Sequence, residues 1–323
     1  MKIFRDISAI PEKYKNSVVV LGNFDGLHLG HRSIIEKARK IADSRNIPLT
    51  LMSFEPHPKE FLQKLKGNNR ELAQEKIRIF NVRSKLSVIK SLNVEAIFLV
   101  RFNKEFSALR ADEFIKDIIV NKLNAAYVIT GQNFYFGKNR QGDKNLLAEK
   151  AALFGFQYED CPQIMDDKNN IISSSAIRDL LNGGEVKKAN KLLGQPYHIG
   201  GRVIQGNQQG RGLGFPTANI KIDNLFIPLK GVYAVKAHIY DKNSSGRYVK
   251  YNAIANIGIK PTFGISKPVL EIHVPDININ LYGKFICAEF IDFIREEKKF
   301  SSLEELKKQI AKDCKQVKES IFV

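Results

Sequence analysis

Long apolar runs and paired cysteines are both missing from this chain of 323 residues. No segment reaches eighteen apolar residues, and the N-terminal sequence MKIFRDISAI has no long apolar core, so we expect neither a membrane span nor a targeting segment. The three cysteines, Cys161, Cys287 and Cys314, are widely spaced and odd in number, which argues against a disulfide framework and a zinc site. We therefore expect a soluble, cytoplasmic protein with reduced thiols and no membrane partner.

Acidic residues are in the minority. The chain has 51 Lys and Arg residues against 34 Asp and Glu residues, which leaves a formal net charge of +17 at pH 7. A surplus of this size is typical of proteins with anionic partners, either nucleotides or nucleic acid. Basic runs such as KLKGNNR are short, and no aromatic-basic RNA motif of the RRM type occurs, so RNA binding is kept only as the alternative class.

Two patterns follow one another along the chain, and 323 residues exceed the usual size of a single core. In the first part, apolar strands alternate with amphipathic helical stretches, which predicts a parallel, doubly wound sheet of the Rossmann-like α/β class. We expect strands near residues 18, 48, 96, 127 and 156, and helices that include residues 31–45 and 75–92.

The pattern changes after Asn182-Gly183-Gly184. One helical run over residues 185–193 leads into short strands and turns, which predict an antiparallel β-barrel. The tail, residues 301–320, opens with serines and keeps Leu303, Leu306 and Ile310 at helical spacing, so we expect a packed C-terminal helix. The predicted domains are residues 1–182 and 183–323, with a linking helix over 183–195.

The most informative segment is SVVVLGNFDGLHLGH, residues 17–31. Its apolar residues predict a strand, its glycines allow backbone to approach a phosphate, and His28 and His31 fall three residues apart at the start of a helix. Backbone N–H groups at a helix N-terminus attract phosphate, and imidazoles can donate hydrogen bonds to phosphate oxygens that gain charge. The segment therefore predicts a site for a nucleoside triphosphate, with plain helix capping as the alternative.

Three further segments of the first part carry polar or aromatic side chains next to predicted strands or helices. FEPHP (residues 54–58) and GQNFYFGKNRQGD (residues 131–143) follow strands, and the carboxyl ends of parallel strands are where ligands bind. ISSSAIR (residues 172–178) places hydroxyls and Arg178 at a helix start. An N-cap needs only a hydroxyl, whereas Arg178 adds a fork of donors suited to phosphate.

The second part holds GGRVIQGNQQGRGLGFPTAN, residues 200–219. It is not a P-loop, because no Gly-Lys-Ser/Thr follows, and Pro216 excludes the helix of a dinucleotide fingerprint. Its glycines and the charges of Arg202 and Arg211 could hold phosphates. Thr217 and Asn219 sit two apart, so in a strand they face the same side and could share one Mg²⁺.

GNFDGLHLGH resembles the signature of the HIGH nucleotidylyltransferases, and more closely the adenylyltransferase half of bacterial bifunctional riboflavin kinase/FAD synthetases. ISSSAIR is similar to the ISSTxIR motif of that family, with Ser175 in place of threonine. The resemblance implies catalysis by His28, His31 and Arg178 and binding of ATP and of flavin by the residues that match the motifs. Those for ATP are Gly22, Asn23, Phe24, Asp25, Gly30, Ser174 and Ser175, and those for flavin are Pro56, His57, Pro58, Asn133 and Phe136.

The second part resembles riboflavin kinase through PTAN, GVYAV, ANIGIKPTFG and VLEIHVPDININLYGK, in the family's order and spacing. The resemblance implies that Glu271 is the general base on the ribityl 5′-hydroxyl, that Thr217 and Asn219 hold Mg²⁺, and that the glycine loop covers ATP. The residues implied in ATP binding are Gly206, Arg211, Gly214 and Pro216. The sequence departs from the family at Gln205, Pro275 and Asn280, and these departures concern flap packing and flavin affinity rather than the reaction.

The implied activity is sequential. Riboflavin is phosphorylated with ATP to FMN in the second domain, and FMN is adenylylated with a second ATP to FAD and pyrophosphate in the first. Riboflavin, FMN and ATP are then the partners, nucleic acid is not, and we expect a monomer or a weak homo-oligomer. A member that retains only FMN adenylyltransferase activity is the alternative within the family.

Overall fold

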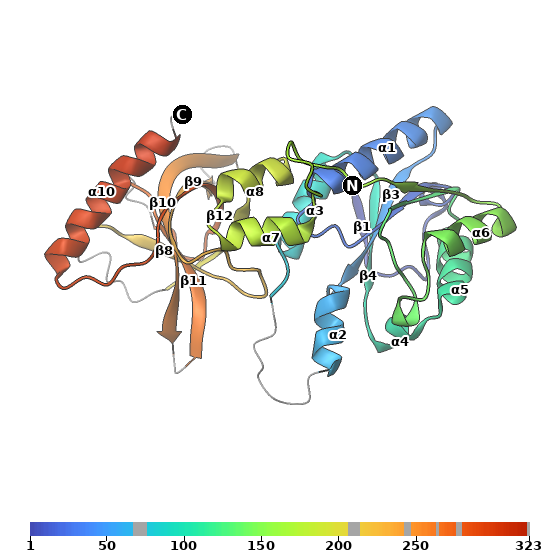
Figure 1. Ribbon diagram of the computed structural model, residues 1–323, viewed down its shortest axis with the longest axis horizontal. Coiled ribbons are helices and arrows are strands. Elements are labelled where there is room, and N and C mark those ends of the chain that lie inside the picture. The colour runs from blue at the N-terminus through green and yellow to red at the C-terminus, as the bar shows by residue number, and fades with distance from the viewer. Residues whose placement is uncertain (67–75, 206–213, 242–246, 263–264, 276–279, 322–323) are drawn as a thin grey trace. The chain divides into compact units, whose positions relative to one another are not determined.

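The computed structural model describes residues 1–66, 76–205, 214–241, 247–262, 265–275 and 280–321 (Figure 1). They form two compact units. Unit 1 is made of residues 1–75 and 85–173, and unit 2 of residues 76–84 and 174–323. The boundary predicted after residue 182 separates the residues of one reaction from those of the other. The division into compact units does not test that boundary, so it stays a prediction.

Unit 1 is built on a six-stranded sheet in which every pairing is parallel, as predicted. The strand order is β1-β4-β3-β2-β5-β6, so the order reverses between β2 and β5. Of the six, only the short edge strand β1 was not expected from the sequence. The strands are β1 (Lys2–Phe4), β2 (Val18–Leu21), β3 (Leu49–Glu55), β4 (Ala96–Arg101), β5 (Tyr127–Gly131) and β6 (Gln157–Cys161).

Helices cover both faces of this sheet. Val18 and Val20 of β2 pack on one face with residues of α1 (Leu29–Arg45) and α3 (Val82–Ser91). Val19 and Leu21 pack on the other face, among residues that belong mainly to the helical segments over 104–122 and 144–154. This alternation follows from the two-residue period of a strand and gives the doubly wound arrangement. The other helices of unit 1 are α2 (Pro58–Lys66), α4 (Lys104–Ala108), α5 (Ala111–Glu113) with its continuation η2 (Phe114–Lys122), and α6 (Lys144–Phe154).

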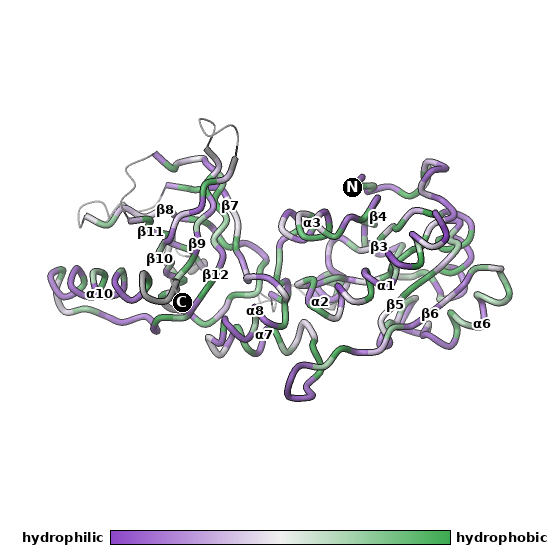
Figure 2. The backbone as a smooth tube through the Cα atoms, turned by 90° about the horizontal axis from the view of Figure 1, so that it is seen from above, coloured by the Kyte–Doolittle hydropathy of each residue, from purple (hydrophilic) through white to green (hydrophobic). Residues whose placement is uncertain are grey.

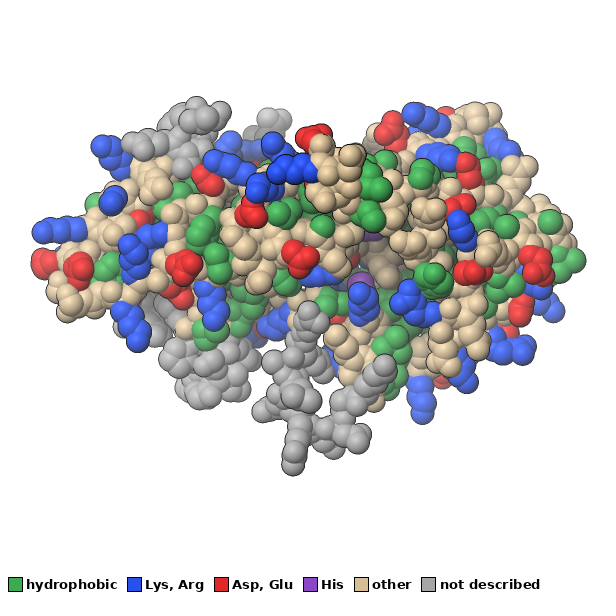
Figure 3. Space-filling model, viewed as in Figure 1, with side chains coloured by type: hydrophobic (Ala, Val, Ile, Leu, Met, Phe, Trp, Pro, Cys, Tyr) green, Lys and Arg blue, Asp and Glu red, His purple; other side chains and the backbone are tan. Residues whose placement is uncertain are grey.

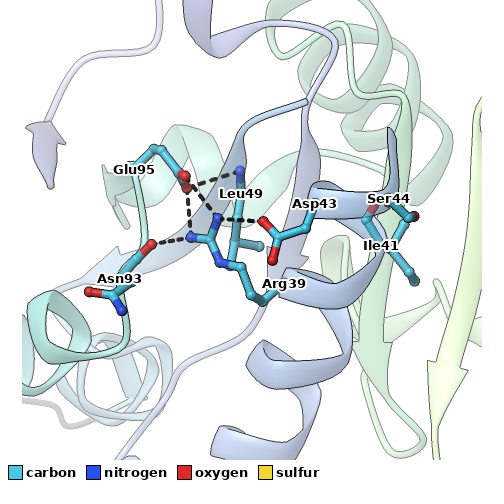
Figure 4. A network of polar contacts seen from close by, with 7 residues as sticks. All are labelled: Arg39, Ile41, Asp43, Ser44, Leu49, Asn93 and Glu95. Atoms are coloured by element: carbon cyan, nitrogen blue, oxygen red, sulfur yellow. Dashed lines mark hydrogen bonds and ion pairs between the residues drawn. The ribbon is translucent and has the colours of Figure 1, made fainter. Parts of the chain in front are cut away.

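A polar network fixes α1 against the sheet (Figure 4). The Arg39 guanidinium donates to both carboxylate oxygens of Glu95 at 2.9 Å, and also to the carbonyl oxygen of Asn93. Glu95 in turn accepts a hydrogen bond of 3.1 Å from the backbone N–H of Leu49, at the start of β3. The bidentate pair holds the helix in one register on the strands, and with it the turn before the helix.

The predicted helix over residues 75–92 begins later than expected, at Val82. The backbone N–H of Ser84 donates to the Asn81 side chain at 2.8 Å, which makes Asn81 the N-cap. Residues 76–81 are not helical, because Ile79 and Phe80 pack into the core of unit 2. The expected start at residue 75 was therefore wrong.

Unit 2 is a closed barrel with strand order β10-β11-β8-β7-β12-β9, and every pairing is antiparallel, as predicted. Its core holds Tyr197, Tyr233 and Phe290, all fully buried. The strands are β7 (His198–Ile204), β8 (Thr217–Lys221), β9 (Gly231–Asp241), β10 (Arg247–Thr262), β11 (Ile265–His273) and β12 (Phe285–Arg295), preceded by α7 (Ser174–Asn182) and α8 (Val186–Leu193).

The chain ends in α10 (Leu303–Ile321), the expected C-terminal helix. Hydrophobic and hydrophilic positions alternate along it (Figure 2). Val317 is buried against Val232 and Ala234, whereas Leu303 is 64% exposed and does not serve the packing expected of it. Asp313 forms a buried ion pair with Arg295, with oxygen–nitrogen distances of 2.7 to 3.1 Å.

On the face drawn in Figure 3, Lys and Arg side chains are interspersed with Asp and Glu over the described surface. In the described part of the chain, no helix combines the length and apolar character that crossing a membrane requires.

Candidate functional sites

The turn between β2 and α1 brings the predicted nucleotide residues to the carboxyl edge of the sheet. Phe24, Gly26 and Leu27 all have positive φ angles of 46° to 78°, so the backbone folds back tightly before the helix begins at Leu29. At Gly22 and Gly30 an added Cβ would meet the Phe24 ring at 3.0 Å and the His28 ring at 3.1 Å. These two glycines leave room for the packed rings.

His28 and His31 stack on one another with ring centroids 3.8 Å apart and 28° between the ring planes. Burial lowers the pKa of His28 to about 4. Burial also lowers the pKa of His31 well below its usual range, and the nearby charges of His28 and Lys85 add to that effect. Both rings are therefore neutral at pH 7, and within the described residues neither Nδ1 atom has a hydrogen-bond partner.

Lys85 is a part of this site that the sequence did not point to. Its Nζ donates to the Asn23 carbonyl oxygen at 2.5 Å and to the Ser53 hydroxyl at 2.6 Å. It therefore ties α3 to the β2–α1 turn and to β3. Its partners lie 62 and 32 positions away in the sequence, and no local pattern reports such a contact.

The β5 loop lies beside this turn, because β2 and β5 are neighbours in the sheet where the strand order reverses. In open α/β sheets, ligands bind at the carboxyl ends of strands at such a reversal. Asn133 is exposed there, as a ligand contact requires. Phe136 is 7% exposed and packs against Phe134 and Phe114, so in this structure it belongs to the core.

The FEPHP segment follows β3. The backbone N–H of Lys59 donates to Nδ1 of His57 at 3.2 Å, so His57 caps α2, which begins at Pro58. The peptide bond between Glu55 and Pro56 is cis. Pro56 and Pro58 are half-buried beside His57.

The ISSSAIR segment spans the division of the chain into units. Ile172 lies in unit 1, where its carbonyl oxygen is 3.5 Å from the position of a Cβ on Gly30, whereas Ser174 begins α7 in unit 2. Arg178 donates to the carbonyl oxygen of Ile77 at 3.0 Å and to the Ser175 hydroxyl at 3.3 Å. The structure thus gives Ser175 and Arg178 a shared contact within unit 2.

In unit 2, the predicted kinase residues meet on neighbouring strands. Asn219 of β8 lies directly opposite Glu271 of β11, and Thr217 lies opposite His273. Ala218, Ile220, Leu270 and Ile272 point into the barrel core, so Asn219 and Glu271 face the other way, on the outside of the barrel. This strand register places the Asn219 amide and the Glu271 carboxylate side by side. Because the two residues are 52 positions apart in the sequence, no local pattern could show that they are neighbours.

The outer face beside β8 is completed by Pro216 and His273. Nδ1 of His273 lies 2.9 Å from the Pro216 carbonyl oxygen, and its ring packs edge-on against Phe215. Thr217 and Asn219 offer a hydroxyl and an amide oxygen on one face of one strand, and oxygen is the ligand type that Mg²⁺ prefers. These donors fit the ion implied by the resemblance.

Of the implied kinase ATP contacts, Gly206 and Arg211 lie outside the described residues. Gly214 has a φ of +84°, a conformation that a side chain would strain. The three departures from the family lie in segments between strands of unit 2. Gln205 follows β7 and Pro275 follows β11, while Asn280 accepts a hydrogen bond of 3.0 Å from the backbone N–H of Tyr282.

Comparison with known proteins identifies relatives over nearly the whole chain. The family model for FAD synthetase matches residues 10–176, and that for riboflavin kinase matches residues 193–321. Bifunctional riboflavin kinase/FMN adenylyltransferases from Buchnera aphidicola subsp. Schizaphis graminum and from Haemophilus influenzae are 40% and 36% identical, each over 98% of both chains. A solved structure described as a macrolide-efflux protein from Streptococcus pneumoniae is 30% identical, covers 98% of both chains and has a TM-score of 0.83.

Proposed function

Because the chain belongs to the family of bifunctional riboflavin kinase/FMN adenylyltransferases, we propose that its two reactions take place at the two sites described above. The enzyme phosphorylates riboflavin to FMN and adenylylates FMN to FAD. Matches to both family models favour this function over the single-activity and RNA-binding alternatives. What we propose is the division of labour among residues.

In the adenylylation, a phosphate oxygen of FMN attacks the α-phosphorus of ATP, the bond from that phosphorus to the bridging oxygen breaks, and pyrophosphate leaves. The FMN phosphate is already a nucleophile, so the protein needs to stabilise charge rather than remove a proton. We assign this to His28 and His31, whose neutral rings can each donate one N–H to an oxygen that gains charge. The observation that carries the assignment is the pair of buried, stacked rings at the start of α1, beside the reversal in strand order.

The remaining adenylylation residues are proposed from the family resemblance. Ser174, Ser175 and Arg178 would bind the triphosphate, and Gly22 and Gly30 would let the backbone approach it. Asn133 would contact the flavin nucleotide, and His57 would act indirectly by fixing the start of α2. The other proposed contacts are Asn23, Phe24 and Asp25 for ATP and Pro56 and Pro58 for flavin, and Phe136 would support the flavin site from the core.

In the kinase reaction, the ribityl 5′-oxygen attacks the γ-phosphorus of ATP, the bond to the β,γ-bridging oxygen breaks, and ADP leaves. Glu271 accepts the proton of the 5′-hydroxyl. Thr217 and Asn219 would hold Mg²⁺, which neutralises charge on the phosphates when bound. Because a carboxylate is a weak base for an alcohol, most of the rate enhancement comes from placing the hydroxyl in line with the phosphorus. Gly206, Arg211, Gly214 and Pro216 would cover the nucleotide.

Separate variants test this division. In His31→Ala, formation of FAD from added FMN should fall at least about a hundredfold, because charge stabilisation of this kind contributes that much, while riboflavin phosphorylation continues. In Glu271→Ala, phosphorylation should fall by about a hundredfold or more, while added FMN is still converted to FAD. Chromatography of the flavins in time courses started from riboflavin and from FMN measures both.

Each variant is the folding control of the other, since each should retain one activity. Loss of both activities in either variant would contradict the assignment to separate sites. Normal riboflavin phosphorylation by Glu271→Ala would remove Glu271 from the role of base. The cytoplasmic location and a monomeric or weakly associated state remain proposals, which fractionation and light scattering would check.

A further inference from the structure

A second carboxylate lies on the outer face of the barrel that carries Glu271. Glu297, just after β12, accepts a hydrogen bond of 3.3 Å from the Asn256 side-chain amide on β10. A Cβ on Gly258 would lie 2.3 Å from Oε1 of Glu297, so in this position the carboxylate packs directly on the backbone of Gly258. Glu297 therefore lies over β10 at Asn256 and Gly258, two positions apart on one face.

Asn256 is the cross-strand neighbour of Glu271. In the register of β10 and β11, Asn256 lies directly opposite Glu271, and on the other side Glu271 lies directly opposite Asn219. Three polar side chains thus form a row across β8, β11 and β10 on the outside of the barrel, with Glu271 in the middle. Adjacent strands are about 4.8 Å apart, so Asn256 lies about one strand spacing from Glu271, on the side away from Asn219.

The geometry of phosphoryl transfer indicates in which direction along this row the substrate extends. The attacking oxygen, the phosphorus and the leaving oxygen lie roughly in line, so the nucleophile's own carbon chain extends away from the nucleotide. With the metal and phosphates on the Thr217 and Asn219 side, and the 5′-hydroxyl at Glu271, the remaining ribityl chain extends over Asn256. We propose that Asn256, held by Glu297, binds a secondary hydroxyl of the ribityl chain of riboflavin, with Glu297 as its positioning residue.

The chemistry of the pair suits a polyol. An amide offers both a donor and an acceptor, and a carboxylate offers only acceptors, so together they can accept from and donate to neighbouring hydroxyls. The hydrogen bond to Glu297 directs the amide nitrogen of Asn256 toward the carboxylate and so fixes which way the amide faces. This inference rests on the proposed kinase function, and it adds recognition of the substrate's sugar-alcohol chain.

Kinetics of riboflavin phosphorylation by the full chain test the inference. In Glu297→Ala, the KM for riboflavin should rise about tenfold, as expected for a lost hydrogen bond to a charged group, with little change in kcat. Lumiflavin has the same ring system with a methyl group in place of the ribityl chain. Its inhibition constant as a competitor of riboflavin should therefore stay within about twofold of the wild-type value. Asn256→Ala should give the same split, and Glu297→Gln, which keeps an oxygen acceptor, should recover most of the lost affinity.

The chain supplies its own controls. Glu296→Ala removes an exposed neighbouring carboxylate and should leave the KM unchanged. Conversion of added FMN to FAD reports whether each variant is folded and active at the other site. A riboflavin KM within about twofold of wild type in both Glu297→Ala and Asn256→Ala would overturn the inference. An equal loss for lumiflavin would do so as well, because the effect would then not be on the ribityl chain. Failure of the wild type itself to phosphorylate riboflavin would instead contradict the proposed function.

Discussion

The rings of His28 and His31 are stacked at the start of α1, and burial keeps both uncharged at neutral pH. The spacing of three residues predicted that they share one face of a helix turn. Their protonation state could not be predicted, because it depends on the packing of Phe24 and on Lys85, which approaches from α3. Glu297 is a similar case, since only the folded barrel brings it to Asn256.

The lowered histidine pKa values predict how the stability of unit 1 depends on pH. In the unfolded chain His28 binds a proton near pH 6.5, but in the folded protein it does so only near pH 4, so the unfolded state holds more protons between these values. Above pH 6.5 the titration of His28 does not lower the free energy of unfolding. As the pH falls toward 4, this titration lowers the free energy of unfolding by an amount on the order of 3 kcal/mol. In His28→Gln, urea unfolding followed from pH 7.5 to 4 should therefore show a shallower loss of stability than in wild type. Parallel curves for the two proteins would contradict the predicted contribution.

Among the elements, strands and helices that bury a continuous apolar face were the most predictable. The apolar runs at Val18 and Ala96 indicated strands of a parallel sheet, and those strands are there. The sequence predicted that the tail is a helix, but it could not predict which residues of the helix are buried. Leu303 fits the helical spacing of apolar residues, and this spacing alone does not show whether its side chain contacts the barrel. The ion pair from Asp313 to Arg295 and the burial of Val317 hold α10 on the barrel, and the ion pair lies at the end of β12, two residues before Glu297.

Removal of one partner of that pair should be costly. In Asp313→Ala the Arg295 guanidinium, which is 15% exposed, loses its counter-charge, and the free energy of unfolding should fall by about 3 to 5 kcal/mol. Leu303→Ala is the matched control on the same helix, and its stability should stay within about 0.5 kcal/mol of wild type because the side chain is exposed. Urea denaturation of unit 2 measures both. Equal effects of the two substitutions would mean that the pair does not anchor α10.

At the scale of the whole molecule, the two fold classes could be predicted from the change of pattern after residue 184, but the path of the chain could not. Residues 76–84 belong to unit 2, although they lie deep within the first half of the sequence. Ile79 and Phe80 are buried in the barrel's core, and the Phe80 ring stacks on His198 with centroids 4.3 Å apart. No local pattern states which of two cores an apolar pair will enter, so this segment was assigned to a helix of the first domain.

Phe80→Ala should therefore lower the stability of unit 2, although most of that unit is formed by residues 174–323. Removing a buried phenylalanine ring typically costs about 3 to 5 kcal/mol, and the loss should appear in the unfolding of unit 2. On heating, riboflavin phosphorylation should therefore disappear at a lower temperature in Phe80→Ala than in wild type. Thermal inactivation profiles of the two activities measure this. Selective loss of the FAD-forming activity would contradict the placement of Phe80.

The membership of residues 76–84 in unit 2 also sets an order of events during synthesis. Residues 85–173, 89 in all, must be translated before the first residue of α7 appears, and most of the barrel follows later still. At about 5 to 20 residues per second, Ile79 and Phe80 leave the ribosome roughly 5 to 19 seconds before α7 begins to emerge. A nascent chain in which unit 1 has already folded therefore carries an apolar pair without its core, a natural binding site for a chaperone until the barrel arrives.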